Sequence, residues 1–427
     1  MWRKARSAVV IAVVAWLLAG TSRAVATSTA ERGLTADQLV QVALEANPQV
    51  KAARARWLSA VHSIQQNYAP ADPIFGYYNI DSPTNGFSAA SEHSLTVTDS
   101  FQFPGKGLLQ ADRAKLSAEV ARLTYEAMIR DIRAQVETAY YQALLDRAQE
   151  EVQAETVASL QQVLKVTQVA YSTSQVTQAD FISAEFDLAT AQLQQRQLRL
   201  SEENDETTIN QLLYRAPDEP LNLEQKIELA PLKTPLDQLI DRAAAARQEI
   251  LAAALAQKNT DTSLELAKLE YAPDYTLGYT FDNYLLSSAA PAENGRMQDH
   301  GFSINFNVPI FFWLKQNEDV KKAGYDLEAA RDDLSSIRSQ TAATVTTLYR
   351  TARFADETAI LYRDSLIPLA RQDFIVALTS YQSGKIDFTM LANTVTATYS
   401  ARSAYLQAAN QFLAGKVALE QAIGEPF

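Results

Sequence analysis

The side chains that most often do chemistry in proteins are few in this sequence and far apart. It has no cysteine and only three histidines, His62, His93 and His300. A nucleophile with its base, or a metal ion with its ligands, needs several such groups close together. The sequence has no metal-ligand spacing and no phosphate-binding glycine loop. Acid pairs such as Glu202-Glu203 are most simply solvated helix faces. We therefore predict a protein that is not an enzyme and that holds no metal or cofactor.

The first 26 residues are predicted to be a secretory signal. Three basic residues near the start precede an apolar run over residues 8–19, and Ala24-Val25-Ala26 fits a small-x-small cleavage site. The run is too short to span ~30 Å of hydrocarbon as a helix, although a retained anchor is the alternative interpretation. Removal of residues 1–26 takes away four basic residues and no acid, so the net charge falls from −12 to −16. This acidity argues against nucleic acid as a partner.

The rest of the chain contains an internal duplication. Similar residues recur in the same order about 200 to 210 positions apart: Tyr68 with Tyr271, Gly76 with Gly278, Phe103-Pro104 with Val308-Pro309, Tyr140 with Tyr349, Tyr171 with Tyr381, and Leu213 with Ile423. We place the two repeats at residues 27–215 and 236–427. The segment between them, 216–235, carries four prolines, which a helix could not accommodate, and is predicted to be a linker.

Each repeat contains a predicted β-hairpin, at about residues 73–104 and 274–309. Apolar and polar residues alternate there, as in Phe302, Ile304 and Phe306 with polar residues between them. The segments approach the ~9 to 11 residues with which a tilted strand crosses a bilayer. A half-buried soluble sheet would show the same alternation. Four strands cannot close a barrel, for which about eight is the minimum, so strands in a membrane would require an oligomer.

Aromatic residues are concentrated around these hairpins. Such clustering is typical of the girdles at membrane interfaces, or of a soluble sheet core. The set comprises Phe75, Tyr77, Tyr78, Phe101, Phe103, Tyr275, Tyr279, Phe281, Phe302, Phe306, Phe311, Phe312 and Trp313. His93 and His300 occupy similar places ahead of the second strand of each hairpin. They are interpreted either as a weak metal contact or as surface histidines without a role.

Long helices are predicted on both sides of each hairpin. Thr35 followed by Gln38 is typical of a capping box that opens the first helix. After the first hairpin, residues 108–172 contain no glycine or proline, so one helix can run about 64 residues. The second repeat matches it over residues 313–380, where Gly324 and Pro368 could introduce kinks. Short polar breaks at 172–178 and 382–387 are predicted to be the tips of two helical hairpins. Helices this long need a coiled-coil or helical-barrel setting.

The segment Tyr381-Gln382-Ser383-Gly384-Lys385-Ile386-Asp387-Phe388, followed by an Ala/Leu-rich helix that ends at Ile423-Gly424, resembles the TolC-type outer membrane efflux proteins. The resemblance covers nearly the whole mature chain. It implies an α+β membrane protein with a long-helix α-barrel in the periplasm and a transmembrane β-barrel completed by trimerisation, four strands per subunit. It also implies location in the bacterial outer membrane, contact with outer-membrane lipid, and two partners, a periplasmic adaptor protein and an inner-membrane pump.

The resemblance also indicates candidate sites at the tips. The adaptor would dock at Ser174, Gln175, Val176, Gly384, Lys385 and Ile386. Residues that would line the tunnel entrance are Asp180, Met390 and Asn393. Two of them, Met390 and Asn393, stand where several relatives have aspartates, so an acidic ring is not supported, and Asp180 is as well explained by a helix-cap role.

We therefore expect the passive duct of a tripartite efflux or type I secretion system. The alternative is a periplasmic coiled-coil scaffold or adaptor-like structural protein. The sequence leaves the cargo, the pump and the gating mechanism open.

Overall fold

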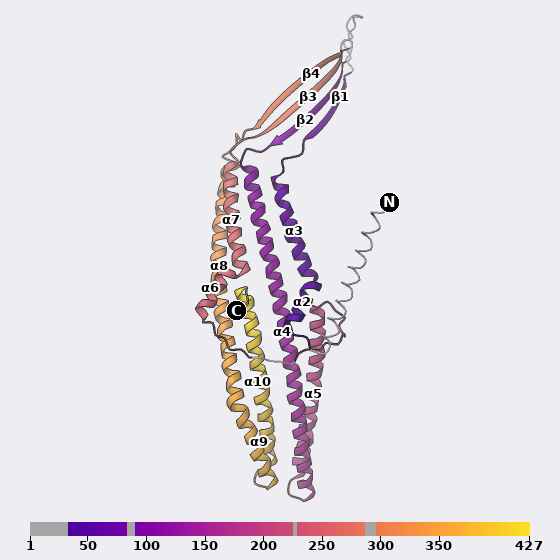
Figure 1. Ribbon diagram of the computed structural model, residues 1–427, viewed down its shortest axis with the longest axis vertical. Coiled ribbons are helices and arrows are strands. Elements are labelled where there is room, and N and C mark those ends of the chain that lie inside the picture. The colour runs from indigo at the N-terminus through magenta and orange to yellow at the C-terminus, as the bar shows by residue number, and fades with distance from the viewer. Residues whose placement is uncertain (1–32, 83–89, 225–228, 287–295) are drawn as a thin grey trace, which may run out of the picture. The chain divides into compact units, whose positions relative to one another are not determined.

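The computed structural model describes residues 33–82, 90–224, 229–286 and 296–427, so the predicted signal at residues 1–26 lies outside the described residues. In the first repeat the elements are α2 (Ala36–Ala46), α3 (Pro48–Tyr68), β1 (Ile74–Ser82), β2 (Ala90–Phe101), α4 (Lys106–Ser172) and α5 (Gln178–Leu212). In the second repeat they are α6 (Leu236–Ala246), α7 (Gln248–Leu269), β3 (Asp274–Leu286), β4 (Arg296–Asn307), α8 (Gln316–Leu361), the π-helix η1 (Tyr362–Leu366), α9 (Ile367–Gln382) and α10 (Phe388–Ile423) (Figure 1). The predicted combination of long helices with one strand pair per repeat is confirmed.

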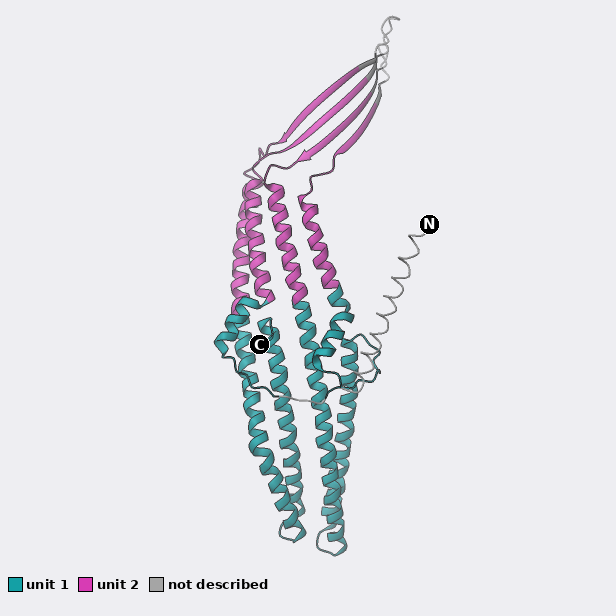
Figure 2. Cartoon of the chain, in the orientation of Figure 1, with its two compact units in different colours: residues 1–51, 127–247, 340–427 teal, residues 52–126, 248–339 magenta. Residues whose placement is uncertain are grey.

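The compact units of the chain do not coincide with the two repeats. Unit 1 comprises residues 1–51, 127–247 and 340–427, and unit 2 comprises residues 52–126 and 248–339 (Figure 2). Each unit therefore takes segments from both repeats. In unit 2, β2 of the first repeat pairs with β3 of the second. Among the described residues, none of the helices combines the length and apolar character that a membrane crossing requires.

The four strands of unit 2 form one antiparallel sheet in the order β1-β2-β3-β4. Its register brings apolar side chains together, because residues directly opposite each other share a face. Val97, for example, lies opposite both Phe75 and Tyr279. One face carries Phe75, Tyr77, Leu95, Val97, Phe101, Tyr275, Leu277, Tyr279, Phe281, Phe302, Ile304 and Phe306. The other carries mostly small and polar residues, among them Gly76, Thr96, Thr98, Ser100, Thr276, Gly278, Thr280, Ser303 and Asn305.

A buried lysine joins the connection between β2 and α4 to the connection between α7 and β3. The side chain of Lys106, at the start of α4, is only 3% exposed. Its Nζ lies 2.9 Å from Asp274 Oδ1, 3.2 Å from Glu270 Oε2 and 3.1 Å from the carbonyl oxygen of Ala272. A buried ammonium is tolerated only when it is paired and hydrogen-bonded, so these contacts hold the end of α7 against the start of α4.

The helices that open each repeat are split in two, which was not predicted. The Thr35–Gln38 capping box that starts α2 is confirmed. At Asn47 the chain turns extended, and Asn47 Oδ1 accepts a hydrogen bond from the backbone N–H of Gln49 in α3. Pro48 lacks an N–H and explains this break. The second repeat breaks at Arg247 without a proline. There Arg247 Nη1 donates to the carbonyl of Ala422, so a tertiary contact holds the turn.

Between two pairs of matching tyrosines, the long helix of the second repeat contains one more residue than that of the first. Tyr140 and Tyr349 match at an offset of 209, whereas Tyr171 and Tyr381 match at 210. The π-helix η1 lies between these two pairs. A π-turn accommodates a single extra residue without ending the helix, so η1 absorbs the insertion. Pro368, one of the two predicted kink positions, follows immediately in the first turn of α9, while Gly324 lies within uninterrupted α8.

Candidate functional site

The turns at the tips of the two helical hairpins of unit 1 have the same backbone geometry. Ser174 and Gly384 both adopt positive φ, 57° and 71°. In each turn the next residue, Gln175 or Lys385, donates its backbone N–H to a carbonyl five residues back. This pattern closes a helix through one left-handed residue, a conformation that glycine adopts freely and serine does not. The two tips therefore differ in side chain but not in backbone.

The return helices begin with different caps. In α5, the Thr177 Oγ1 accepts from the Asp180 N–H, and the Asp180 carboxylate accepts from the Thr177 N–H at 2.9 Å. In α10, Asp387 takes the cap position and accepts from the Met390 N–H at 2.9 Å. Asp180 is therefore a helix-capping residue, whatever further role it has. Met390, its match in the second repeat, is 57% exposed.

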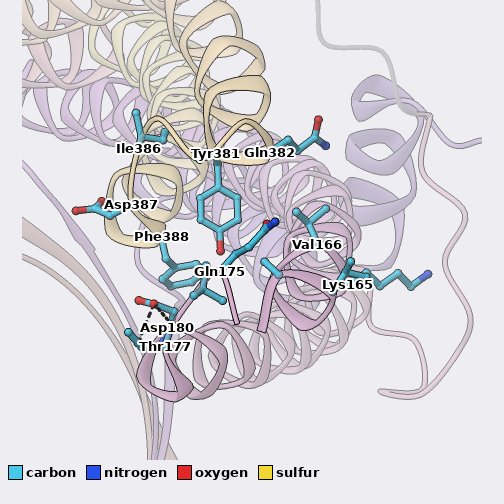
Figure 3. A pocket seen from close by; sticks show the side chains of 14 residues that line it. Lys165, Val166, Gln175, Thr177, Asp180, Tyr381, Gln382, Ile386, Asp387 and Phe388 are labelled. Carbon is cyan, nitrogen blue, oxygen red and sulfur yellow. Dashed lines mark hydrogen bonds between the residues drawn. The ribbon is translucent and has the colours of Figure 1, made fainter. Parts of the chain in front are cut away.

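A groove of about 530 Å³ lies between the two tips. Its apolar part is formed by Tyr381 and Phe388, which are both buried and whose rings meet edge to face. The Tyr381 hydroxyl lies 3.2 Å from Thr167 Oγ1 of α4, so this bond ties one hairpin to the other. Figure 3 shows Tyr381 and Phe388 directed towards the turn that carries Thr177 and Asp180. The groove thus has an apolar floor and a partly charged rim.

The structure brings together some of the predicted tip residues. Gln175, Val176, Asp180, Gly384 and Ile386 line the groove. The remaining four do not line it: Ser174, Lys385, Met390 and Asn393. Their roles remain predictions.

Sequence reasoning did not identify several of the residues that line the groove. Lys165 and Val166 of α4 line it, as does Tyr381. The repeated tyrosine was the available clue, since Tyr381 matches Tyr171. The two differ in surroundings: Tyr381 is buried in the groove, whereas Tyr171 is 42% exposed and stacks on Phe181.

The two hairpin histidines lie within strands, not ahead of them. His93 belongs to β2 and His300 to β4. The Nδ1 atom of each lies 2.8 Å from a tyrosine hydroxyl, that of Tyr77 or Tyr279 respectively. The described residues contain no group of three or more side chains that could hold a metal ion. Each histidine is thus engaged with a tyrosine in the same position of its own repeat.

A cluster of acids lies between α4 and α5. Burial, together with the neighbouring Asp146 carboxyl and Glu202, raises the pKa of Asp205 to about 7. Burial also raises the pKa of Glu206, again with a contribution from Glu202. Arg147 partly offsets this charge, since its Nε donates to Glu202 Oε1 at 2.7 Å. The Asp205 carboxyl is therefore partly protonated near neutral pH.

Comparison with solved structures shows the same fold in several outer-membrane proteins. The chain resembles the outer membrane protein VceC of Vibrio cholerae with a TM-score of 0.76 at 15% identity, over 92% of this chain and 96% of that one. For the outer membrane channel CmeC of Campylobacter jejuni the TM-score is 0.72 at 16% identity, over 91% and 85%. For the Neisseria gonorrhoeae outer membrane channel MtrE, solved in its open state, it is 0.75 at 16% identity, over 91% and 89%.

A comparison with curated proteins found no significant match. The family model described as outer membrane efflux protein, however, matches twice, over residues 39–213 and 239–425. The two matches together cover most of the chain, and each contains one strand pair and one long helical hairpin. The chain therefore belongs to the outer membrane efflux protein family, and it is an outer-membrane efflux duct that extends into the periplasm.

Proposed function

We propose that this protein works as a homotrimer, a passive duct in which three sheets close one twelve-stranded barrel and the long helices form a periplasmic tunnel. An inner-membrane pump would load the duct through a periplasmic adaptor protein. The observation that carries the proposal is the sheet itself, which combines one apolar face with two open edges, β1 and β4.

Open edges are incompatible with hydrocarbon. Each unpaired backbone group there costs several kcal/mol, so membrane-spanning strands occur in closed barrels. Strands β1 and β4 run antiparallel to their single neighbours in the described residues, and with four alternating strands β4 of one copy would also run antiparallel to β1 of the next. Three copies supply twelve strands, an even number as in other bacterial barrels.

The exposure of the apolar face disfavours the soluble-scaffold alternative. The side chain of Phe302 is 86% exposed and that of Phe75 is 78% exposed, although both lie in the sheet's apolar face. A soluble sheet would cover such residues with helices or with a second sheet. Lipid contact on this face and water on the polar face account for both patterns.

The strand closure can be tested with cysteine pairs, because the chain has no cysteine of its own. One cysteine replaces Tyr78 in β1, and a second replaces Ser303 or Asn305 in β4. We expect oxidation of trimers in membranes to give covalent dimers and trimers only when both strands carry a cysteine. The control is a pair at Thr96 and Thr280, which lie opposite each other in β2 and β3 and should link within one chain. A monomer that is soluble without detergent contradicts the proposal. A purified protein that does not conduct ions in planar bilayers contradicts it as well.

The groove between the tips is the proposed adaptor site. Its apolar floor and charged rim suit a partner that inserts an apolar side chain and pairs polar groups around it. Docking at Ser174, Gln175, Val176, Gly384, Lys385 and Ile386 would use both turns of one subunit. The tunnel entrance would be formed by Asp180, Met390 and Asn393.

The substitution Val176→Asp tests this site, because it places a carboxylate beside the groove floor. Loss of export in cells is expected, with trimer formation and single-channel conductance unchanged. The matched control is Ile182→Asp, which alters an exposed isoleucine of α5 outside the groove and should leave export unchanged. Equal loss from both substitutions would remove the groove from the proposal.

A further inference from the structure

The buried Lys106 at the start of α4 has a matching lysine in the second repeat. Lys106 and Lys315 match at an offset of 209, which also relates Tyr140 to Tyr349. Identical residues recur at this offset along the segment between them: Ala114 with Ala323, Glu119 with Glu328, Arg122 with Arg331, and Val136 with Val345. Lys315 directly precedes α8, and its carbonyl accepts from the N–H of Asp319, which lies in the first turn. Each long helix therefore begins at a lysine.

The acid that pairs with Lys106 is duplicated as well. Lys106 Nζ lies 2.9 Å from Asp274 Oδ1, a contact here named the internal ion pair. Asp274 matches Asp72 at an offset of 202, which also relates the glycines of β3 and β1. The second acid at Lys106, Glu270, matches Asn67 at an offset of 203, where an amide oxygen can still accept a hydrogen bond. Both members of the internal ion pair thus have a counterpart of the same charge.

These counterparts have no partner within one copy of the chain. Lys315 and Asp72 are both exposed, and neither side chain forms an ion pair in the part of the chain that the structure describes. Glu318, in the first turn of α8, pairs with Lys321 at 2.8 Å. An ammonium at the start of a helix meets the positive end of the helix dipole. An acid from another part of the assembly would therefore stabilise Lys315 where it stands.

The two counterparts belong to opposite edges of the sheet. Lys315 follows β4 and Asp72 precedes β1, the outermost strands in the order β1-β2-β3-β4 (Figure 1). Inside the chain, β2 pairs with β3, and the internal ion pair joins the connections that follow β2 and precede β3. Because β4 is the repeat of β2 and β1 the repeat of β3, pairing of β4 with β1 of the next copy reproduces this arrangement. It brings Lys315 to Asp72 of the next copy.

The connection between α3 and β1 is less covered than its match between α7 and β3. Tyr68, at the end of α3, is 65% exposed, whereas the matching Tyr271 is 39% exposed. A groove of about 790 Å³ has residues 67–71 in its lining, so this connection borders open space. The matching connection is held by the contacts of Lys106 with Glu270, Ala272 and Asp274. A second copy of the chain would provide the first connection with the same kind of cover.

We propose that Lys315 of each subunit forms an ion pair with Asp72 of the next, here named the subunit ion pair. Subunit and internal ion pairs then alternate around the trimer where the strands meet the helices. The partner is a second copy of this chain, and opposite charge at two matching positions selects it over other surfaces. The inference rests on the proposed function, because the sheet edges must meet for the two residues to come together.

The absence of cysteine from the chain allows a mixed-subunit cross-link to test this contact. Subunits that carry Asp72→Cys are co-expressed with subunits that carry Lys315→Cys. We expect oxidation of the trimers to give covalent dimers with one subunit of each kind, and none when either variant is expressed alone. The control combines Asp72→Cys with Lys321→Cys, which alters an exposed lysine six residues further along the chain and should give no cross-link.

Ion conductance of the same trimers separates the two proposals. Conducting trimers without the mixed dimer overturn the subunit ion pair and leave the duct intact. Equal cross-linking of the Lys321→Cys control overturns the ion pair in the same way. Failure to obtain conducting trimers from the parent chain overturns the duct and the subunit ion pair together.

A charge exchange tests whether the ion pair stabilises the assembly. Lys315→Glu and Asp72→Lys should each shorten the lifetime of the trimer in detergent several-fold, because each brings like charges together. The two substitutions combined restore a pair with exchanged signs and should recover most of the parent's lifetime. Exchange of tagged subunits measures it.

The control for the charge exchange combines Glu318→Lys with Lys321→Glu. This exchanges an exposed ion pair within α8 and should leave the lifetime of the trimer unchanged. Losses that add up in the Lys315→Glu, Asp72→Lys double variant, without recovery, contradict the subunit ion pair.

Discussion

The two long helical hairpins of unit 1 are copies in sequence but pack differently at one matching level. In the second hairpin, Gly415 of α10 faces Ala352 of α8 so closely that an added Cβ would lie 3.0 Å from the Ala352 Cβ. The position that matches Gly415 in the first hairpin is Asp205, at the offset of 210 that holds from the tips to the end of the repeat. Asp146 of α4 likewise matches Ala355, at the offset of 209. A dry contact in one repeat is therefore a pair of carboxyls in the other.

The comparison shows that one architecture tolerates two kinds of helix contact. Gly415 and Ala352 let α8 and α10 pack so closely that there is little room for a larger side chain, and Ala352 and Ala355 are almost fully buried there. Between α4 and α5 the raised pKa of Asp205, about 7, leaves its carboxyl partly protonated near neutral pH, and Glu202 accepts a hydrogen bond from Arg147. The stability of the α8–α10 contact should therefore depend on side-chain volume, and that of the α4–α5 contact should depend on pH.

The largest effect should come from filling the dry contact. Gly415→Leu forces a side chain into the space of Ala352, and we expect a loss of about 3 kcal/mol in the free energy of unfolding. Denaturant unfolding of the trimer in detergent measures it. The matched substitution Asp205→Leu should cost less, because it replaces a half-buried acid in a contact that already holds a side chain. If Gly415→Leu and Asp205→Leu lowered the free energy of unfolding equally, the two contacts would not differ in how they tolerate a larger side chain.

The second effect is the pH dependence of the first hairpin. Burial and the neighbouring Asp146 carboxyl raise the pKa of Asp205 from its ordinary value of 3.8 to about 7 in the folded protein, so the folded state binds the proton more tightly. The contribution of Asp205 to stability is therefore greatest at low pH and falls as pH rises from about 4 to about 7.

The substitution Asp205→Asn tests this sign. It should remove the fall and make the variant more stable than the parent at alkaline pH, by on the order of 1 kcal/mol once solvent screening of a half-exposed group is allowed for. Thermal unfolding midpoints on either side of neutral pH measure the difference. Asp332→Asn, at an exposed position of α8, should leave the parent's pH profile unchanged. A parent whose stability does not fall over this range would refute the assignment.

The smallest effect concerns the tips. Ser174 adopts φ 57°, where a side chain is strained, whereas the matching Gly384 at φ 71° is not. We expect Ser174→Gly to stabilise the first tip by about 0.5 to 1 kcal/mol and Gly384→Ser to destabilise the second by a similar amount. Hydrogen–deuterium exchange of the backbone amides in each turn measures both. Opposite signs at the two tips are required, and exchange that moves in the same direction at both would contradict the shared turn geometry.

Much of the fold could be predicted because its causes are local. A run without glycine or proline between residues 108 and 172 predicted α4, and alternation predicted the strands. The break at Arg247 could not be predicted, because no proline marks it and a contact with Ala422 maintains it. The π-helix was not predicted either. The offset between matching tyrosines of the two repeats changes from 209 to 210, which indicates an inserted residue but not the structure that accommodates it.

For the candidate site, the sequence indicated the turns but not the groove. Gly384 and the cap residues are recognisable from short motifs, because a turn and a helix start depend on neighbours in the chain. The bond between Tyr381 and Thr167 joins residues 214 positions apart, and the shift in the pKa of Asp205 depends on Asp146 in another helix. Neither leaves a periodic pattern in the sequence.

The sequence by itself determined the order of elements, the duplication, and the presence of one apolar and one polar side in each strand. These follow from backbone preferences and from the period of the hydrophobic pattern. Only the tertiary structure decided that strands of both repeats share one sheet with a mostly apolar face, that Tyr381 links the two hairpins, and that matching helix contacts are apolar in one repeat and acidic in the other. Those features depend on distances between residues remote in the chain, which packing alone sets.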